Sequence, residues 1–247
     1  MTASAPRVDD GIGTGATRVL VVAAHPDDAD FGSAGSVALW TDAGIDVSYC
    51  IVTDGDAGGA DPSIPPRELA GIRRDEQRAA AALVGVRDVH FLGYPDGALV
   101  ASVELRRDIC RVVRALRPDR LVCQSPERYW DAIGASHPDH LAAGEAAVCA
   151  FYPDARNPFA HPALLDEGLE PHTVRELWLC AHPEPNRAVD VTGSFDRKIA
   201  ALRCHVSQVG QGEWLAGRVG GWLEAGARSA GLPAGRLAEL FRVVTAP

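Results

Sequence analysis

The sequence predicts an α/β protein built on a Rossmann-like, doubly wound and mostly parallel sheet with helices on both faces. Short continuous apolar runs alternate along the chain with longer segments of helical periodicity. This alternation is typical of parallel strands that are joined by helices. The first run, RVLVVAA over 18–24, shows no polar–apolar alternation, as expected of a strand that is buried on both faces.

Each element follows from its local pattern. Apolar runs predict strands over 18–24, 46–53, 89–92, 120–125, 174–181 and 188–191. Helical spacing predicts helices over 33–43, 67–84, 102–117, 138–151 and 194–208, with a further helical tail to 242. Gly44 and Pro118 end the first and third of these helices, and Ser194 is expected to cap the fifth. The segments 54–66 and 126–136 are expected to be loops, and 152–173, with its four prolines, a surface excursion.

We expect one domain over 18–247, preceded by a flexible arm over 1–17. The arm contains GIGTG, which resembles a dinucleotide-binding loop. That loop works by following a strand and opening a helix, whereas GIGTG precedes the first strand. The motif is therefore discarded.

Charge and composition exclude several kinds of partner. The net charge of −9 over 247 residues argues against a nucleic-acid surface and against an anionic membrane. No signal-peptide pattern and no apolar run of the ~18–20 residues that span a membrane is present, so a cytoplasmic enzyme is expected. The six cysteines never form a CxxC pair, and we interpret them as reduced core thiols.

The first chemical motif is His25-Pro26-Asp27-Asp28, directly after the first strand. Open α/β sheets place their active sites at the carboxyl ends of the strands. Imidazole and carboxylate are good ligands for a divalent metal. Taken alone, the motif is equally explained by a capping aspartate beside a surface histidine.

The second motif is His137-Pro138-Asp139-His140, after the fourth strand. Two histidines three residues apart are a weak signal by themselves. In the doubly wound order 3-2-1-4, however, strands one and four are neighbours, so the two motifs converge on one crevice. Four other histidines are assigned surface or loop positions: His90, His161, His172 and His182.

With these residues, AAHPDDADFGSAG and SHPDHLAAG, the chain resembles the LmbE-like, or PIG-L, N-deacetylases. Members of this family include the deacetylases of mycothiol and bacillithiol biosynthesis and the enzyme acting on N-acetylglucosaminyl-phosphatidylinositol. Weaker similarity extends over TDGDAGG (53–59), IRRDEQRAAAALVGV (72–86), FLGYPDG (91–97) and KIAALRCHVSQ (198–208). The resemblance implies a Rossmann-like fold.

The resemblance also implies roles at matching positions. It implies His25, Asp28 and His140 as metal ligands, Asp27 as general base, and His137 as the group that steadies or protonates the reacting atoms. It further implies a substrate contact at Arg73, a sugar-hydroxyl acceptor at Asp96, and Gln208 near the metal's water. Asp30 departs from the family, which often has Glu there, and a shorter carboxylate could alter how the ligands are oriented.

The resulting hypothesis is a metal-dependent hydrolase that removes an N-acyl group, in particular acetyl, from an amino sugar such as an N-acetylglucosaminide. Zinc is the expected metal, and ferrous iron is the alternative, since imidazole and carboxylate ligands suit both. One alternative is an amidase acting on a thiol conjugate, and another, of a different class, is a non-catalytic Rossmann-like module that binds a sugar or nucleotide. The expected partner is a small-molecule amino sugar, and the sequence leaves open whether the protein is a homo-oligomer.

Overall fold

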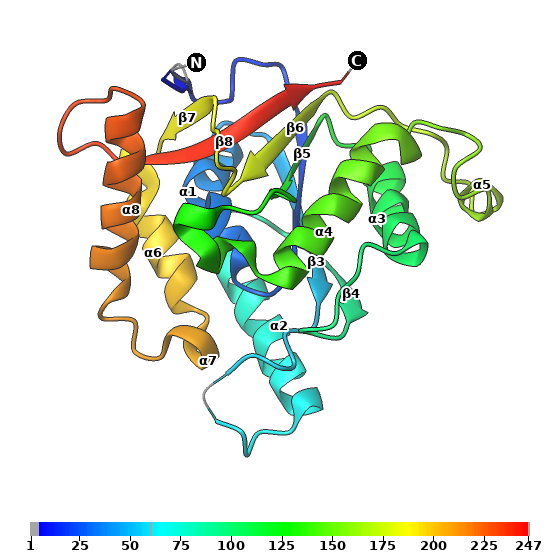
Figure 1. The fold of residues 1–247 in the computed structure, drawn as a ribbon, viewed down its shortest axis with the longest axis horizontal. Helices are drawn as coiled ribbons and strands as arrows, with labels where there is room; N and C mark the ends of the chain where they lie inside the picture. Colours follow the sequence, from blue (N-terminus) through cyan, green and yellow to red (C-terminus); the bar gives the residue numbers. More distant parts are fainter. Residues whose placement is uncertain (1–4, 60, 247) are drawn as a thin grey trace.

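The computed structural model describes residues 5–59 and 61–246, and within them the strands form a single eight-stranded sheet (Figure 1). The strand order is β1-β7-β8-β6-β5-β2-β3-β4. Only β8 runs antiparallel to its neighbours. The strands are β1 (Arg7–Val8), β2 (Arg18–Ala23), β3 (Asp46–Thr53), β4 (Asp88–Tyr94), β5 (Arg120–Gln124), β6 (Glu176–Cys180), β7 (Arg187–Asp190) and β8 (Ala238–Thr245). The predicted fold class is confirmed.

Helices cover both faces of this sheet. The helices are α1 (Asp28–Asp42), α2 (Pro66–Leu83), α3 (Val103–Leu116), α4 (Pro138–Cys149), α5 (Ala163–Asp166), α6 (Phe195–Arg203), α7 (Val206–Val209) and α8 (Leu215–Ser229). Residues of α1, α2, α6 and α8 share one buried cluster with the sheet, and residues of α3 and α4 share another. Figure 1 shows α6 and α8 on one side of the sheet and α3 and α4 on the other. None of the described helices is long and apolar enough to cross a membrane.

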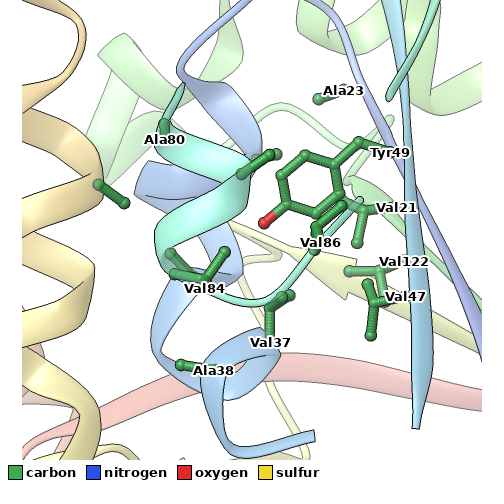
Figure 2. Close-up of a cluster of buried hydrophobic side chains, with 14 of the residues drawn as sticks. Val21, Ala23, Val37, Ala38, Val47, Tyr49, Ala80, Val84, Val86 and Val122 are labelled. Carbon is green, nitrogen blue, oxygen red and sulfur yellow. The ribbon is translucent and has the colours of Figure 1, made fainter. Parts of the chain in front are cut away.

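The strand β2 lies at the centre of the core. Its residues alternate between the two clusters, with Val19 and Val21 in one and Leu20 and Val22 in the other. Figure 2 shows the first cluster, where Tyr49 of β3 lies among valines of the strands and residues of α1 and α2. Burial on both faces explains why the sequence of β2 is apolar without interruption.

The predicted neighbours of β2 are also confirmed. It pairs in parallel with β3 on one side and with β5 on the other, with Val22 opposite Cys123. In the core of the sheet the order is therefore β4-β3-β2-β5, the predicted 3-2-1-4. The loops that leave β2 and β5 start side by side.

The expected helical tail to residue 242 is wrong. The helix α8 ends at Ser229, and Ala238–Thr245 form β8 between β6 and β7. Gly231 and Gly235 both adopt positive φ in the connection, and they flank Pro233, so the helix cannot continue. The segment that follows contains Phe241, Val243 and Val244, residues that favour strands.

Two helix boundaries and one helix cap also differ from the prediction. The helix α1 begins at Asp28 instead of residue 33. The segment expected as one helix over 194–208 is divided into α6 and α7, separated at Cys204 and His205. Ser194 does not cap α6 through its side chain, because its hydroxyl donates instead to the carbonyl of Gly35 at 2.8 Å.

The expected loop over 126–136 and the expected surface excursion over 152–173 both contain helical turns. The segment 126–136 includes a 3-10 helix, η1 (Trp130–Ser136), and 152–173 includes α5.

All six cysteines are free thiols, and those at 50, 110, 123 and 180 are buried.

The expected N-terminal arm makes specific contacts where it is described. Residues 1–4 lie outside the described residues. Arg7 and Val8 form β1 against β7. Arg120 donates to the carbonyl of Gly11 at 2.7 Å, and its guanidinium stacks on the ring of Trp178 at 4.1 Å.

Asp119 fastens the start of β2 to the start of β5. Its carboxylate accepts hydrogen bonds from the backbone and hydroxyl of Thr17, at 2.8 and 2.9 Å, and from the backbone of Arg18 at 3.1 Å. Burial raises the pKa of Asp119, but these hydrogen bonds and the charge of Arg175 outweigh it and lower the pKa to about 2.

We predict that Asp119→Asn destabilises the protein by about 1 kcal/mol near pH 7, after allowance for solvent screening. The pKa of Asp119 is lower in the folded protein than the ~3.9 of an unfolded chain. The ionised carboxylate therefore stabilises the fold above about pH 4 and loses that effect as the pH falls through about 2. Urea unfolding of both proteins should show a difference that shrinks by about half near pH 3. A difference of equal size at both pH values would contradict this role.

Candidate active site

A polar cavity of about 310 Å³ lies where the carboxyl ends of β2 and β5 meet. It is lined by His25, Asp27, Asp28, Ala57, Gly58, Arg73, Asp96, Gly134, His137, His140 and Gln208. The two motifs are therefore brought together, along with Arg73, Asp96 and Gln208. Asp30 is the one predicted site residue that does not line the cavity.

The carboxylate of Asp28 lies between two imidazoles. One oxygen is 3.0 Å from Nδ1 of His25, and the other is 3.1 Å from Nε2 of His140. Ligand atoms at ~2.0–2.1 Å from a tetrahedral zinc stand ~3.3 Å apart. The chemistry of these three side chains fits a divalent metal, and the two distances from Asp28 are close to that spacing.

Two further carboxylates hold the far side of the His25 ring. Its Nε2 lies 3.0 Å from Asp96 and 3.2 Å from Asp139. Burial lowers the pKa of His25, but hydrogen bonds to Asp28 and Asp96 outweigh it and raise the pKa to about 11. Carboxylates behind a histidine fix the ring and direct its other nitrogen toward a metal.

Asp139 belongs to the second motif, but the sequence alone indicated no role for it, and the structure places it against His25. It is fully buried, and its carboxylate accepts hydrogen bonds from the backbones of Gly97 at 2.7 Å and Leu99 at 3.2 Å. The second motif therefore contributes its aspartate as well as its histidines. Its place inside HPDH was the only feature of the sequence that pointed to Asp139, and the fold shows that it faces His25.

The two histidines of the second motif are held differently. His140 has Nδ1 3.1 Å from the carbonyl of Ala135, which leaves Nε2 facing Asp28. His137 caps α4, because its Nδ1 accepts a hydrogen bond from the backbone of Asp139 at 3.2 Å. A neutral imidazole that accepts at Nδ1 carries its proton at Nε2, so His137 can donate that proton.

Asp27 lies beside these residues with an unusual backbone, φ 104° and ψ −30°. Its carboxylate is 3.4 Å from Arg73 and belongs to the cavity wall. Burial, together with the charge of Asp28, raises the pKa of Asp27 to about 7.

Arg73 is almost fully buried, and its guanidinium lies against a glycine-rich turn. It donates to the carbonyls of Gly55 at 3.0 Å and Pro26 at 2.6 Å. A Cβ atom on Gly55 or on Gly58 would overlap this guanidinium. The close approach of Arg73 therefore explains Gly55 and Gly58, two of the three glycines of TDGDAGG.

Asp30 and His205 form a buried pair behind the cavity. Both are fully buried, and Nε2 of His205 lies 2.9 Å from the Asp30 carboxylate. Gln77 donates to the same oxygen at 2.8 Å. Neither Gln77 nor His205 was singled out from the sequence, although both lie in segments of the weaker family similarity.

A second cluster, Cys110, Asp154 and His161, also brings potential metal ligands together. Both carboxylate oxygens of Asp154 already accept hydrogen bonds from Arg106, each at 2.8 Å. A guanidinium in that position occupies the carboxylate and repels a cation. This cluster is therefore a structural ion pair.

The fold and the cavity define a class: Rossmann-like α/β proteins with a histidine–carboxylate centre at the topological switch point. The comparisons define the family. Residues 20–151 match the PIG-L model, described as GlcNAc-PI de-N-acetylase, and the chain belongs to this family.

Curated relatives and a solved structure agree with this assignment. Diacetylchitobiose deacetylase of Thermococcus kodakarensis is 33% identical over 80% of this chain and 72% of its own. The 1D-myo-inositol 2-acetamido-2-deoxy-alpha-D-glucopyranoside deacetylase of Rhodococcus erythropolis is 28% identical over 78% and 82%. The structure of N,N'-diacetylchitobiose deacetylase from Pyrococcus horikoshii, in complex with the inhibitor MPG, superposes with a TM-score of 0.87 at 31% identity, covering 95% of this chain and 86% of that one.

The contact between α4 and β5 gives a prediction about Gly144, which follows HPDH. A Cβ atom at Gly144 would overlap the backbone carbonyl of Gln124. We expect Gly144→Ala to destabilise the protein by about 1–3 kcal/mol through overpacking, measured by urea unfolding. The control is Gly221→Ala, a helix glycine with open space around its Cβ position, which should stabilise by about 0.5–1 kcal/mol. Equal effects of the two substitutions would contradict the contact.

Proposed function

We propose that the protein is a zinc-dependent N-deacetylase that hydrolyses the acetamide of an N-acetylglucosaminide. The observation that carries this proposal is the Asp28 carboxylate lying between His25 and His140, with Asp27 beside it on one cavity wall. The named relatives act on N-acetylglucosamine-containing substrates, which supports this substrate over a thiol conjugate.

His25, Asp28 and His140 would hold the metal. Two histidines and one carboxylate leave a coordination position open, the pattern of catalytic rather than structural zinc. When bound, zinc supplies Lewis-acid polarisation of a carbonyl and lowers the pKa of a water molecule toward ~7. Asp96 and Asp139 contact Nε2 of His25, and this would keep Nδ1 of the ring directed at the metal.

Asp27 is the proposed general base. A carboxylate bound to a metal cannot also take a proton, so Asp28 is unsuited to this step while its neighbour is free for it. Asp27 would accept the proton of the attacking water as its oxygen forms a bond to the amide carbon. A positioned base typically contributes ~10²–10⁴ in rate.

His137 is the proposed hydrogen-bond donor to the oxyanion. Its Nδ1 is occupied by the backbone of Asp139, so the proton of the neutral ring lies on Nε2. From there it can donate a hydrogen bond to the developing oxyanion, and the proton that Asp27 accepted from the water passes to the amine nitrogen as the C–N bond breaks. The products are acetate and the free amino sugar.

Substrate recognition is assigned to Arg73, Asp96 and Gln208. All three line the cavity, whose volume falls within the range of small-ligand sites. One oxygen of Asp96 faces His25 and the other lies 3.8 Å from Arg73, so a sugar hydroxyl would share this carboxylate with the arginine.

The metal assignment has a direct competitor in this cavity. Nitrogens of His25, His137 and His140 lie within 4.8 Å of one another and could hold a metal without Asp28. We predict that Asp28→Asn and His140→Ala lose bound zinc, whereas His137→Ala keeps about one zinc per chain. Metal content after zinc loading and gel filtration, measured by mass spectrometry, checks this. Loss in His137→Ala with retention in Asp28→Asn would assign the three-imidazole set instead.

For the base, we predict that Asp27→Asn lowers kcat for N,N'-diacetylchitobiose about 10²–10⁴-fold. Zinc content should stay at that of the unsubstituted protein, because Asp27 is not a ligand. Acetate release measured on zinc-loaded protein checks the rate. Turnover by Asp27→Asn at the full rate would refute the assignment.

A further inference from the structure

The backbone of Asp27 is held in a conformation that side-chain-bearing residues rarely adopt. Its φ of 104° lies in the region that favours glycine. Such a residue costs on the order of 1–3 kcal/mol and persists only where its surroundings over-determine it. The structure therefore contains contacts that hold Asp27 in place.

Two side chains of α2 form hydrogen bonds with the peptide group that joins Pro26 to Asp27. The carbonyl of Pro26 accepts a hydrogen bond from Arg73 at 2.6 Å, and the N–H of Asp27 donates to Oε1 of Gln77 at 2.8 Å. Arg73 and Gln77 are four residues apart and thus lie on the same face of the helix. Both polar atoms of one peptide plane are bound, so the plane cannot rotate without breaking a buried hydrogen bond.

The side-chain amide of Gln77 is itself oriented by Asp30. Its Nε2 donates to the carboxylate of Asp30 at 2.8 Å, and His205 approaches the same oxygen at 2.9 Å. A carboxylate only accepts hydrogen bonds and a backbone N–H only donates. The amide fits between Asp30 and Asp27 in one orientation, with its nitrogen toward Asp30.

Burial makes this arrangement specific. Gln77, Asp30 and His205 are all fully buried, so water cannot replace a lost partner at low cost. The orientation of the Pro26–Asp27 peptide therefore helps to determine where the Asp27 carboxylate points.

We propose that Gln77, oriented by Asp30 and His205, is a positioning residue that fixes the Asp27 carboxylate for catalysis. This inference rests on the proposed role of Asp27 as general base. Gln77 does not line the cavity, so it acts through the backbone of Asp27 and not on the substrate. It also gives Asp30 a role, which is to orient the Gln77 amide.

The central test is Gln77→Met, which keeps the approximate volume of the side chain and removes both hydrogen bonds. We expect kcat for N,N'-diacetylchitobiose to fall about 10- to 100-fold, with KM changed less than about threefold and zinc content unchanged. The matched control is Thr41→Val. Thr41 also ties α1 to the end of α2, by donating to the carbonyl of Val84 at 2.6 Å, but it lies at the other end of α1 from the site. The substitution Thr41→Val should lower the melting temperature and leave kcat unchanged.

A double-mutant cycle separates positioning from general damage. If Gln77 acts through Asp27, Gln77→Met should not lower the residual kcat of Asp27→Asn further. A full 10- to 100-fold loss in that background would overturn the proposal, as would an unchanged kcat in Gln77→Met alone. Full activity of Asp27→Asn would instead remove the proposed base and this inference together.

A second variant keeps the test valid if Gln77→Met does not fold. Asp30→Asn preserves the shape of residue 30 but offers both donor and acceptor, so the Gln77 amide loses its single orientation. We expect a smaller drop in kcat with unchanged zinc content, and again no further loss in the Asp27→Asn background. Unchanged kcat in Asp30→Asn would overturn the orienting role of Asp30 and the positioning mechanism built on it.

Discussion

The site depends on one constraint, the parallel pairing of β2 with β5. This pairing places the ends of two strands side by side although His25 and Asp139 are 114 residues apart in the chain. Two short motifs, neither of which is a metal site alone, then share one cavity. Hydrogen bonds donated by the backbones of Thr17 and Arg18 to the Asp119 carboxylate connect the opposite ends of the same two strands.

The C-terminal part of the chain supports the site through a buried ion pair. Lys198 of α6 and Glu239 of β8 are 2.7 Å apart and fully or almost fully buried. Lys198 donates to the carbonyls of Asp30 and Phe31, and Glu239 accepts from the backbones of Gly35 and Ser36. The pair is thus inserted beside the backbone of α1, which begins at Asp28. A buried pair with its hydrogen bonds satisfied fixes geometry more than it adds stability, and here it fixes the helix that carries a proposed metal ligand.

Much of this architecture could be predicted from the sequence because its causes are local. The uninterrupted apolar run of β2 indicates burial on both faces, and strand–helix alternation indicates a doubly wound sheet. The common strand order of such sheets, 3-2-1-4, then brings the two motifs together. The final strand β8 could not be predicted in this way, since it is defined by pairing with β6 and β7. The same holds for Ser194, whose hydroxyl reaches Gly35 instead of capping its own helix. No role could be assigned to Asp139, Gln77 or His205 from the sequence for a related reason. A buried hydrogen bond between distant segments leaves no periodic pattern in the sequence.

The central claim is that one metal, held where Asp28 lies between His25 and His140, supports deacetylation of an amino sugar. The most direct measurement is a titration of metal-free protein with zinc, following acetate release from N,N'-diacetylchitobiose. Activity should be absent without metal, rise in proportion to bound zinc and level off at about one zinc per chain. Full acetate release by the metal-free protein, or none at any zinc loading, would contradict the account.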